Sequence, residues 1–169
     1  DAQESRGLGD VYKRQIVNHA FVKTISLTYK KMPFLRIAPI CNGKIYVAPR
    51  SYQGEEPGKL DIPMEDYIYA CKTDTDKYAK EVENKYSNHI TGQPEPRFSL
   101  KHLVKETNGV KKTIMLYILP LNDEEQIHFT GGKFVTPEEI EMNSAQYSSF
   151  LKEEVDHLNI VAQMWEEFK

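Results

Sequence analysis

KLDIPMEDYIYACKTDTDKYAKEVENKY, residues 59–86, is the stretch from which the fold of this chain can be inferred. It begins with a short extended segment at residues 60–63, and a loop follows. A helix comes next, and its N-cap is expected among the Thr and Asp residues at 73–76, because their side chains accept hydrogen bonds from a first helical turn. The apolar side of this helix consists of Tyr78, Ala79, Val82, Tyr86 and Ile90. Thr-Gly-Gln-Pro at residues 91–94 ends it.

A β-hairpin is predicted on each side of this stretch. The first joins residues 35–40 to residues 45–48 through Asn42 and Gly43, which suit the two positive-φ positions of a type I′ turn. The second joins residues 97–106 to residues 112–119 around a Thr-Asn-Gly turn at 107–109. The returning strand is apolar on both faces, which is typical of a strand in the interior of a sheet.

The C-terminal third is predicted to be mainly helical. A short strand is expected at residues 126–129, followed by a Gly-Gly turn. Thr136 then suits an N-cap, Pro137 the first helical position and Glu139 the third, so a short helix begins there. A long helix is predicted from residue 145 to residue 168. Its broad apolar face contains Tyr147, Leu151, Val155, Leu158, Ala162 and Trp165.

The N-terminal part is treated separately from the domain at residues 33–169. Residues 10–15, DVYKRQ, match a translation of an adapter used in sequencing libraries, so residues 1–15 are interpreted as an artefact or a disordered segment. Residues 16–32 have amphipathic periodicity and are expected to form an additional packing or linker helix. The order of elements predicts an α/β (α+β) fold with a mixed sheet flanked by helices.

Composition narrows the classes of function. The 169 residues suffice for one domain with a proper core, and the net charge of −3 indicates no general affinity for nucleic acid. Cys41 and Cys71 are expected to be free thiols in a reducing compartment, which favours a cytoplasmic location. The sequence has no run of eighteen apolar residues, so no membrane span is expected. The five histidines lack the spacing of a zinc site.

Several segments resemble the Nudix hydrolase family in the right order. Residues 36–50, RIAPICNGKIYVAPR, look like the family's opening hairpin. Residues 61–63, Asp-Ile-Pro, look like the Leu-Pro step that begins the Nudix box, and residues 134–140, FVTPEEI, are similar to a late Trp-Val-Thr-x-Glu-Glu-Leu segment. The resemblance spans about residues 33–168. It implies a Nudix-like mixed sheet, extended here by the N-terminal helix and the long C-terminal helix.

The family's box helix presents carboxylates to Mg²⁺, which bridges the diphosphate of a substrate linked to a nucleoside diphosphate. By the resemblance, Lys80 lies where the box has Arg, and Glu81 lies on the first Glu of the helix. Asn84 and Lys85 replace the two consecutive Glu residues. Glu81 is thus the one candidate catalytic residue, and Glu81 with Glu83 would be the metal ligands if a metal binds. The box is degenerate, because Met64 and Glu65 also replace its paired glycines.

A retained scaffold with a degenerate box implies a domain that is not an enzyme, needs no cofactor, and binds a ligand or partner. A regulatory piece of a longer protein is the expected role. The expected partners are a nucleotide-like small molecule or another protein. Candidate ligand-binding residues are Arg50, Tyr67 and Lys80, and Tyr52, Tyr67 and Tyr69 are candidates to stack on a base. One alternative is a Mg²⁺-dependent pyrophosphohydrolase that takes carboxylates from Glu65, Asp66, Glu83 or Glu125. Another is the cytosolic tail of a membrane protein, with residues 16–32 as the connecting helix.

Overall fold

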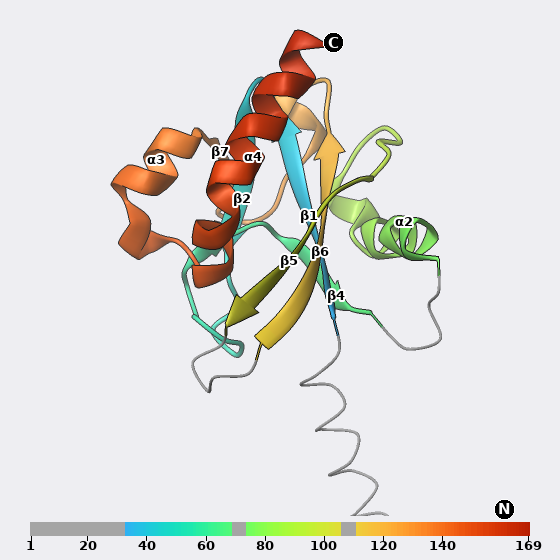
Figure 1. Cartoon of the computed structure of the whole chain (residues 1–169). Helices are drawn as coiled ribbons and strands as arrows, with labels where there is room; N and C mark the ends of the chain where they lie inside the picture. The colour runs from blue at the N-terminus through green and yellow to red at the C-terminus, as the bar shows by residue number, and fades with distance from the viewer. Residues whose placement is uncertain (1–32, 69–73, 106–110) are drawn as a thin grey trace, which may run out of the picture. The chain divides into compact units, whose positions relative to one another are not determined.

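The computed structural model of the chain describes residues 33–68, 74–105 and 111–169 (Figure 1). The predictions for residues 1–15 and 16–32, for the turn at 107–109, and for Tyr69 and Cys71 lie outside the described residues. Within the described part of the chain, no helix has both the length and the apolar character that crossing a membrane requires.

A mixed sheet forms the middle of the domain, and most of its strands follow one path. In spatial order, that path runs through β3 (Leu60–Asp61), β2 (Lys44–Pro49), β1 (Phe34–Cys41), β6 (Lys111–Pro120) and β5 (Arg97–Lys105). Off this path, β4 (Met64–Tyr67) pairs with β1 and β7 (Lys133–Val135) pairs with β2. β1 and β6 run parallel, whereas the other pairs are antiparallel. The sheet is therefore mixed, as the sequence predicts.

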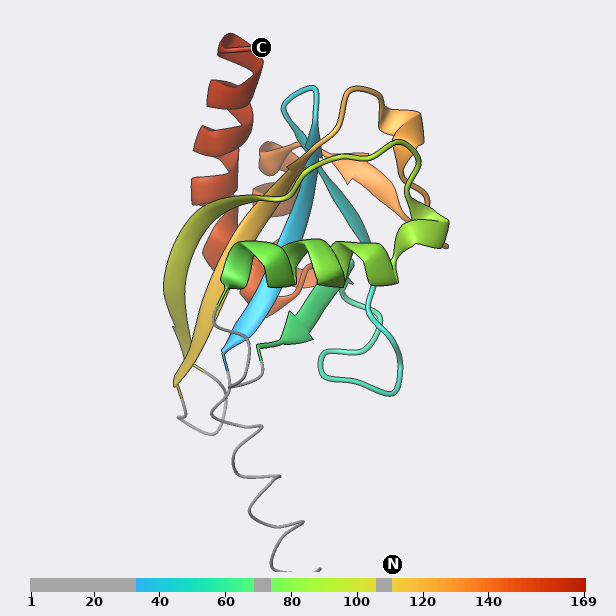
Figure 2. The ribbon, with the colours of Figure 1, turned by 90° about the vertical axis from the view of Figure 1, so that its right-hand side faces the viewer.

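Helices cover both faces of the sheet. Figures 1 and 2 show α4 (Ser149–Glu167) on one face and α2 (Thr75–Lys85) on the other. The short helix α3 (Pro137–Met142) lies on the side of α4. Among the described residues, 3₁₀ turns occupy Ser87–His89, Glu124–Gln126 and Ser144–Gln146. This arrangement confirms the predicted α+β class with flanking helices and a long C-terminal helix.

β1 and β6 carry apolar side chains on both faces, which explains why helices cover both faces of the sheet. On β6, Leu116 and Ile118 pack in the core beneath α4, whereas Tyr117 and Leu119 pack in the core beneath α2. On β1, Ile37 belongs to the α2 side. β6 lies between β1 and β5, so the prediction of an interior strand is confirmed.

Two predicted elements are wrong. Residues 64–67, predicted as a loop, form β4, which pairs with β1 from Phe34↔Tyr67 to Ile37↔Met64, because β1 extends beyond its hairpin partner and offers unpaired backbone groups. Residues 126–129, predicted as a strand, do not form one: Gln126 is the last residue of a 3₁₀ turn, and residues 127–129 follow that turn. A capping box between Asp123 and Gln126 closes that turn, and an isolated bridge from Ile127 to Ile90 follows it.

Three helix boundaries depend on capping. Asp74 caps α2 by accepting a hydrogen bond from the Lys77 amide, and α2 ends at Lys85, before the predicted end near Ile90. Thr136 caps α3 with Pro137 in the first turn, as predicted. α4 begins after its cap Ser148 and not at residue 145, because Tyr147 makes an extended bridge to Leu60.

Gly132 permits a close approach that any side chain would prevent. A Cβ at this position would lie 2.0 Å from the hydroxyl of Tyr46, which is 3 % exposed. We expect Gly132→Ala to lower the free energy of unfolding by about 1–3 kcal/mol, because overpacking forces the buried phenol to move. Urea unfolding followed by fluorescence measures the loss. Gly54→Ala is the matched control, since its Cβ would meet only the Ser51 carbonyl at 3.9 Å, and equal losses in both variants would contradict this account.

Candidate functional site

The candidate site residues of the box helix, Lys80, Glu81 and Glu83, do not all lie in one site. Glu83 is 6 % exposed, and its carboxylate lies 3.6 Å from Nζ of Lys80. Burial raises the pKa of Glu83, and the positive charge of Lys80 opposes that rise. Both side chains line a small pocket of about 270 Å³, which Glu81 does not line. The structure thus brings Lys80 and Glu83 together without Glu81.

Lys85 lies where the resemblance expects a metal-binding Glu, and it turns to the sheet. Its ammonium group pairs with the carboxylate of Asp66 on β4. Asp66 is one of the acids that the hydrolase alternative needs, so this ion pair occupies it. The last turn of α2 therefore presents a cation held against an acid of the sheet.

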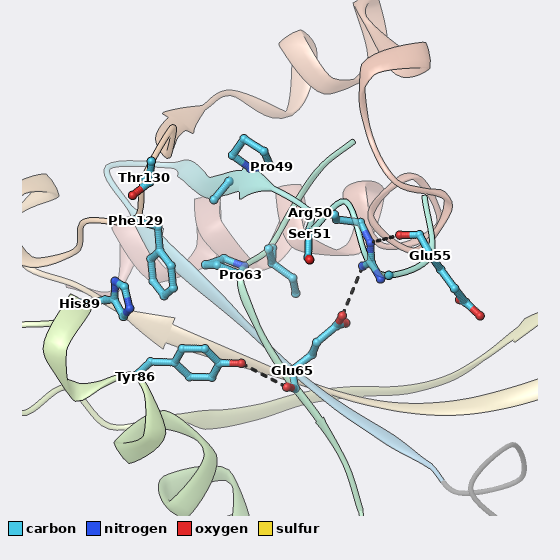
Figure 3. A pocket seen from close by; sticks show the side chains of 13 residues that line it. Pro49, Arg50, Ser51, Glu55, Pro63, Glu65, Tyr86, His89, Phe129 and Thr130 are labelled. Atoms are coloured by element: carbon cyan, nitrogen blue, oxygen red, sulfur yellow. Dashed lines mark hydrogen bonds and ion pairs between the residues drawn. The ribbon is translucent and has the colours of Figure 1, made fainter. Parts of the chain in front are cut away.

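Arg50 follows β2 and lines a larger pocket of about 480 Å³, which we call the Arg50 pocket (Figure 3). Its size lies in the range of small-molecule sites. One wall holds Arg50, Ser51 and Glu55 from the loop after β2, together with Glu65 from β4. The remaining lining residues are Ala48, Pro49, Gly54, Ile62, Pro63, Tyr86, His89, Phe129 and Thr130.

Three rings form the facing wall of the Arg50 pocket (Figure 3). His89 and Phe129 are stacked with ring centroids 4.0 Å apart and 7° between their planes, and Tyr86 lies 5.8 Å from Phe129. The Phe129 amide donates to the Tyr46 hydroxyl at 2.8 Å, which fixes the loop that carries this ring. Nδ1 of His89 donates to the His128 carbonyl at 3.0 Å, which fixes the imidazole. The wall is therefore held by contacts behind it.

A buried charge cluster lies behind the Arg50 pocket. Arg36 on β1 is fully buried and donates to Glu154 of α4, with Nη2 2.8 Å from Oε1. It also donates to Asp61 at 2.7 Å and to Glu65 at 2.7 Å. Asp61 and Glu154 are themselves buried, at 1 % and 0 % exposed. A single guanidinium thus joins β1, β3, β4 and α4.

Arg50 extends the buried charge cluster to the pocket. Its Nη1 donates to Asp61 and, at 3.3 Å, to Glu65, while its Nε donates to the Glu55 carbonyl at 2.8 Å. Burial alone would raise the pKa of Asp61, but the charge and hydrogen bonds of Arg36, together with Arg50, hold that pKa below its ordinary value. Burial lowers the pKa of Arg50, and the charges of Glu65 and Asp61 outweigh it, so the pKa is raised.

The cluster continues through α4 to the edge strand β5. Nε2 of His102 lies 3.0 Å from Glu154, and Ser99 lies 2.6 Å from Nε2 of His157. Burial and the nearby charge of His102 lower the pKa of His157. Phe150 packs beside the cluster, with the guanidinium carbons of Arg36 and Arg50 lying 5.2 and 5.9 Å from its ring centroid.

Sequence reasoning missed this cluster. The signal available was Arg36, a charged residue within the apolar strand FLRIAPIC, because a fully buried Arg needs acidic partners. Those partners come from distant parts of the chain, with Glu154 lying 118 residues away. No local pattern connects them.

The predicted ligand-binding residues are not gathered in one place. Arg50 lines the larger pocket, Lys80 lines the smaller one, and Tyr67 lines neither. Tyr67 stacks on Phe34 with centroids 4.3 Å apart. Tyr52 also lines neither pocket and is 85 % exposed.

Three of the acids named above as possible Mg²⁺ ligands, Glu65, Asp66 and Glu83, do not fit the ion. Glu65 accepts hydrogen bonds from two guanidiniums, Asp66 pairs with Lys85, and Glu83 faces Lys80. Each acid therefore already has a cation beside it that would repel a metal ion. Among residues 33–68, 74–105 and 111–169, no three Asp, Glu, His or Cys side chains are grouped as a metal site needs.

The comparisons with known proteins concern the fold. No protein-family model matches the sequence, and neither does any curated protein sequence. A NUDIX hydrolase from Nitrosomonas europaea is similar in structure, with a TM-score of 0.56 and 11 % identity over 78 % of this chain and 90 % of that one. The dihydroneopterin triphosphate pyrophosphohydrolase of E. coli has a TM-score of 0.55 and 15 % identity, over 79 % of this chain and 99 % of that one.

A third similar structure is the NUDIX domain of Shewanella oneidensis NrtR, complexed with ADP ribose. It has a TM-score of 0.51 and 12 % identity, and the match covers 82 % of this chain and 89 % of that one. At these identities the likeness concerns the backbone arrangement. Together with the mixed sheet between α2 and α4, these matches show that the chain has a Nudix-like fold.

Proposed function

We propose that this Nudix-fold domain binds a small ligand in the Arg50 pocket without hydrolysing it, and acts as a binding or regulatory module. The observation that carries the proposal is the pairing of the candidate acids. Glu65, Asp66 and Glu83 each face a Lys or Arg of the protein itself. A metal-dependent hydrolase needs such acids to converge on the ion instead.

The size of the electrostatic repulsion shows why these paired cations oppose metal binding. Two unit charges 4 Å apart interact by roughly 4 kcal/mol at an effective dielectric of 20. Even part of that repulsion from Lys85 would reduce the affinity of the helix end for a divalent ion by orders of magnitude. The altered box is thus a reason to expect binding without catalysis.

The Arg50 pocket supports the binding half of the proposal. It combines a wall of three rings with a small number of polar groups, which is the usual composition of a small-molecule site. The NrtR domain, a protein of similar fold, is complexed with ADP ribose. A Nudix-fold domain can therefore hold a ligand of the size of ADP ribose.

The catalytic half is tested by measuring phosphate release from a panel of nucleoside-diphosphate compounds with Mg²⁺ or Mn²⁺. We expect no turnover above that of the Glu81→Gln variant, because Glu81 is the single acid retained at a family position of the box. Turnover by the unaltered chain that Glu81→Gln abolishes would overturn the proposal.

The binding half is tested in EDTA by titrating small aromatic fragments into isotope-labelled protein. We expect amide shifts at Phe129 and Thr130 to saturate without added metal. Phe129→Ala removes one ring of the wall and should abolish these shifts. Fragments that shift only residues distant from the Arg50 pocket would contradict this site.

A further inference from the structure

We infer that the edge of β5 that faces away from β6 binds an extended acidic segment of a partner protein, which joins the sheet as a further strand. This surface is separate from the Arg50 pocket, because no described residue of β5 lines that pocket. The inference follows from three features of the edge: its backbone groups, its exposed apolar side chains and its positive charge.

The backbone of β5 can accept another strand. β5 is the last strand on the path of the sheet, and Figure 2 shows it at the margin of the domain. It pairs with β6 from Leu100↔Leu116 to Lys105↔Lys111, and no other strand of the described chain pairs with it. Every second residue of such a strand directs its N–H and C=O groups away from its neighbour. An exposed edge of this kind is a template for strand addition.

The edge also exposes apolar side chains. Val104 packs in the core beneath α4, and Leu100 packs against the same core. Lys101 and Leu103 alternate with these residues, so they lie on the opposite face of the sheet. Leu103 is 61 % exposed, and Phe98, nearer the start of β5, is 49 % exposed. A strand added here would cover apolar surface that now faces solvent.

The hairpin of β5 and β6 is basic within an acidic protein. Residues 97–120 contain five Lys or Arg residues and one Glu, whereas the whole chain has a net charge of −3. Arg97, Lys101 and Lys111 are exposed, and no carboxylate of the described residues forms a salt bridge with any of them. Their charges therefore attract an acidic partner.

These features also decide which partner fits. Two copies of β5 placed edge to edge would bring basic side chains together, and lysines on an edge strand discourage pairing between copies. A nucleic acid would use the positive charge but neither the backbone groups nor Leu103. An extended segment with acidic and apolar residues alternating along one face uses all three features, because its acids reach Lys101 and its apolar side chains cover Leu103.

Three capped peptides of nine residues provide the probes. The first, ETVTETVTE, alternates Glu and Val along one face of a strand. The second has Lys in place of each Glu, and the third is the first with N-methyl groups on its three central amides, which prevents backbone pairing. We expect the acidic peptide to bind at least about 10-fold more tightly than the other two, with amide shifts at Lys101 and Leu103. Added salt should weaken this binding.

Variants test the charge and the apolar contact separately. Lys101→Glu should weaken binding of the acidic peptide by at least about 10-fold and strengthen binding of the lysine peptide. Leu103→Ser should weaken binding of the acidic peptide by about 3- to 10-fold, because apolar contact is lost. Lys133→Glu is the matched control. This exposed lysine lies on β7, which pairs with β2 and not with β5, so its replacement should have no effect.

The outcomes separate strand addition from its alternatives. Equal binding of the acidic and lysine peptides, or no loss on N-methylation, would overturn the inference. A single-stranded oligonucleotide that shifts the same amides as strongly would assign this edge to nucleic acid instead. Amide shifts of β5 that change on dilution of the protein alone would assign it to a second copy. Neither result bears on the Arg50 pocket, whose ligand tests can fail or succeed independently.

Discussion

Replacing Arg36 with Met is expected to lower the free energy of unfolding by about 3–5 kcal/mol, because removing one partner leaves buried charges without compensation. Arg36 is the shared donor to Asp61, Glu65 and Glu154. Without it, Asp61 and Glu154 remain buried beside one another's charge. Urea unfolding at pH 7 measures the loss.

The pH dependence gives this prediction a second readout. The pKa of Asp61 is lowered in the folded chain, so its contribution to stability is present above about pH 4 and is lost as the pH falls below that value. In the Arg36→Met variant, the effect of burial on the Asp61 carboxyl dominates, and the pKa of Asp61 should rise. The contribution of Asp61 to stability should then increase, and not decrease, as the pH falls. We therefore expect the difference between variant and parent to shrink as the pH is lowered from 7 to 3.

Arg97→Met is the matched control. Arg97 is an exposed arginine of β5 whose guanidinium carbon lies 5.3 Å from the ring centroid of Trp165. Its replacement should cost less than about 1 kcal/mol, as is typical of exposed cation–π contacts. The charge cluster does not hold the sheet and α4 together if Arg36→Met lowers the free energy of unfolding by as little as Arg97→Met. The same conclusion follows if the loss of stability caused by Arg36→Met does not change with pH.

Phe150→Ala is expected to lower the free energy of unfolding by about 3–5 kcal/mol, as large-to-small changes of buried aromatic residues do. Phe150 is 4 % exposed and packs edge-on against Phe34, with ring centroids 6.4 Å apart and 88° between the planes. Both Arg36 and Arg50 lie over its ring. Its loss should also free Arg50 to move and alter the amide shifts of the Arg50 pocket.

Phe150→Leu separates packing from the aromatic contribution. Leu retains most of the apolar volume, so we expect a smaller loss than with Ala, together with the same disturbance of Arg50. Thermal and urea unfolding give the stability, and the amide spectrum reports on the pocket. Equal stability of the Ala and Leu variants would show that the ring does not fill a tightly packed site.

Local patterns were sufficient where the chain folds through near neighbours. Asn42 and Gly43 have φ values of 54° and 74°, as a type I′ turn requires, and the hairpin from β1 to β2 follows. Thr136 and Pro137 begin α3 as predicted. These features depend on backbone preferences within a few residues, which one sequence reveals.

Distant pairing explains the elements that were missed. β4 exists because β1 offers a free edge to Met64–Tyr67, and nothing within those four residues indicates that edge. The late start of α4 also depends on a contact across the fold, the bridge from Tyr147 to Leu60.

The sequence by itself determined the mixed α+β class, the two hairpins, the caps of α2 and α3 and the replacement of the box acids by Asn84 and Lys85. The tertiary structure alone decided which groups the charged side chains contact. It placed Arg50 beside Glu65 in one pocket, Lys80 in another, and Arg36 against Glu154. The physical reason is that a side chain's charge is set by its type, whereas its partners and its burial depend on segments that meet only when the sheet and α4 have packed.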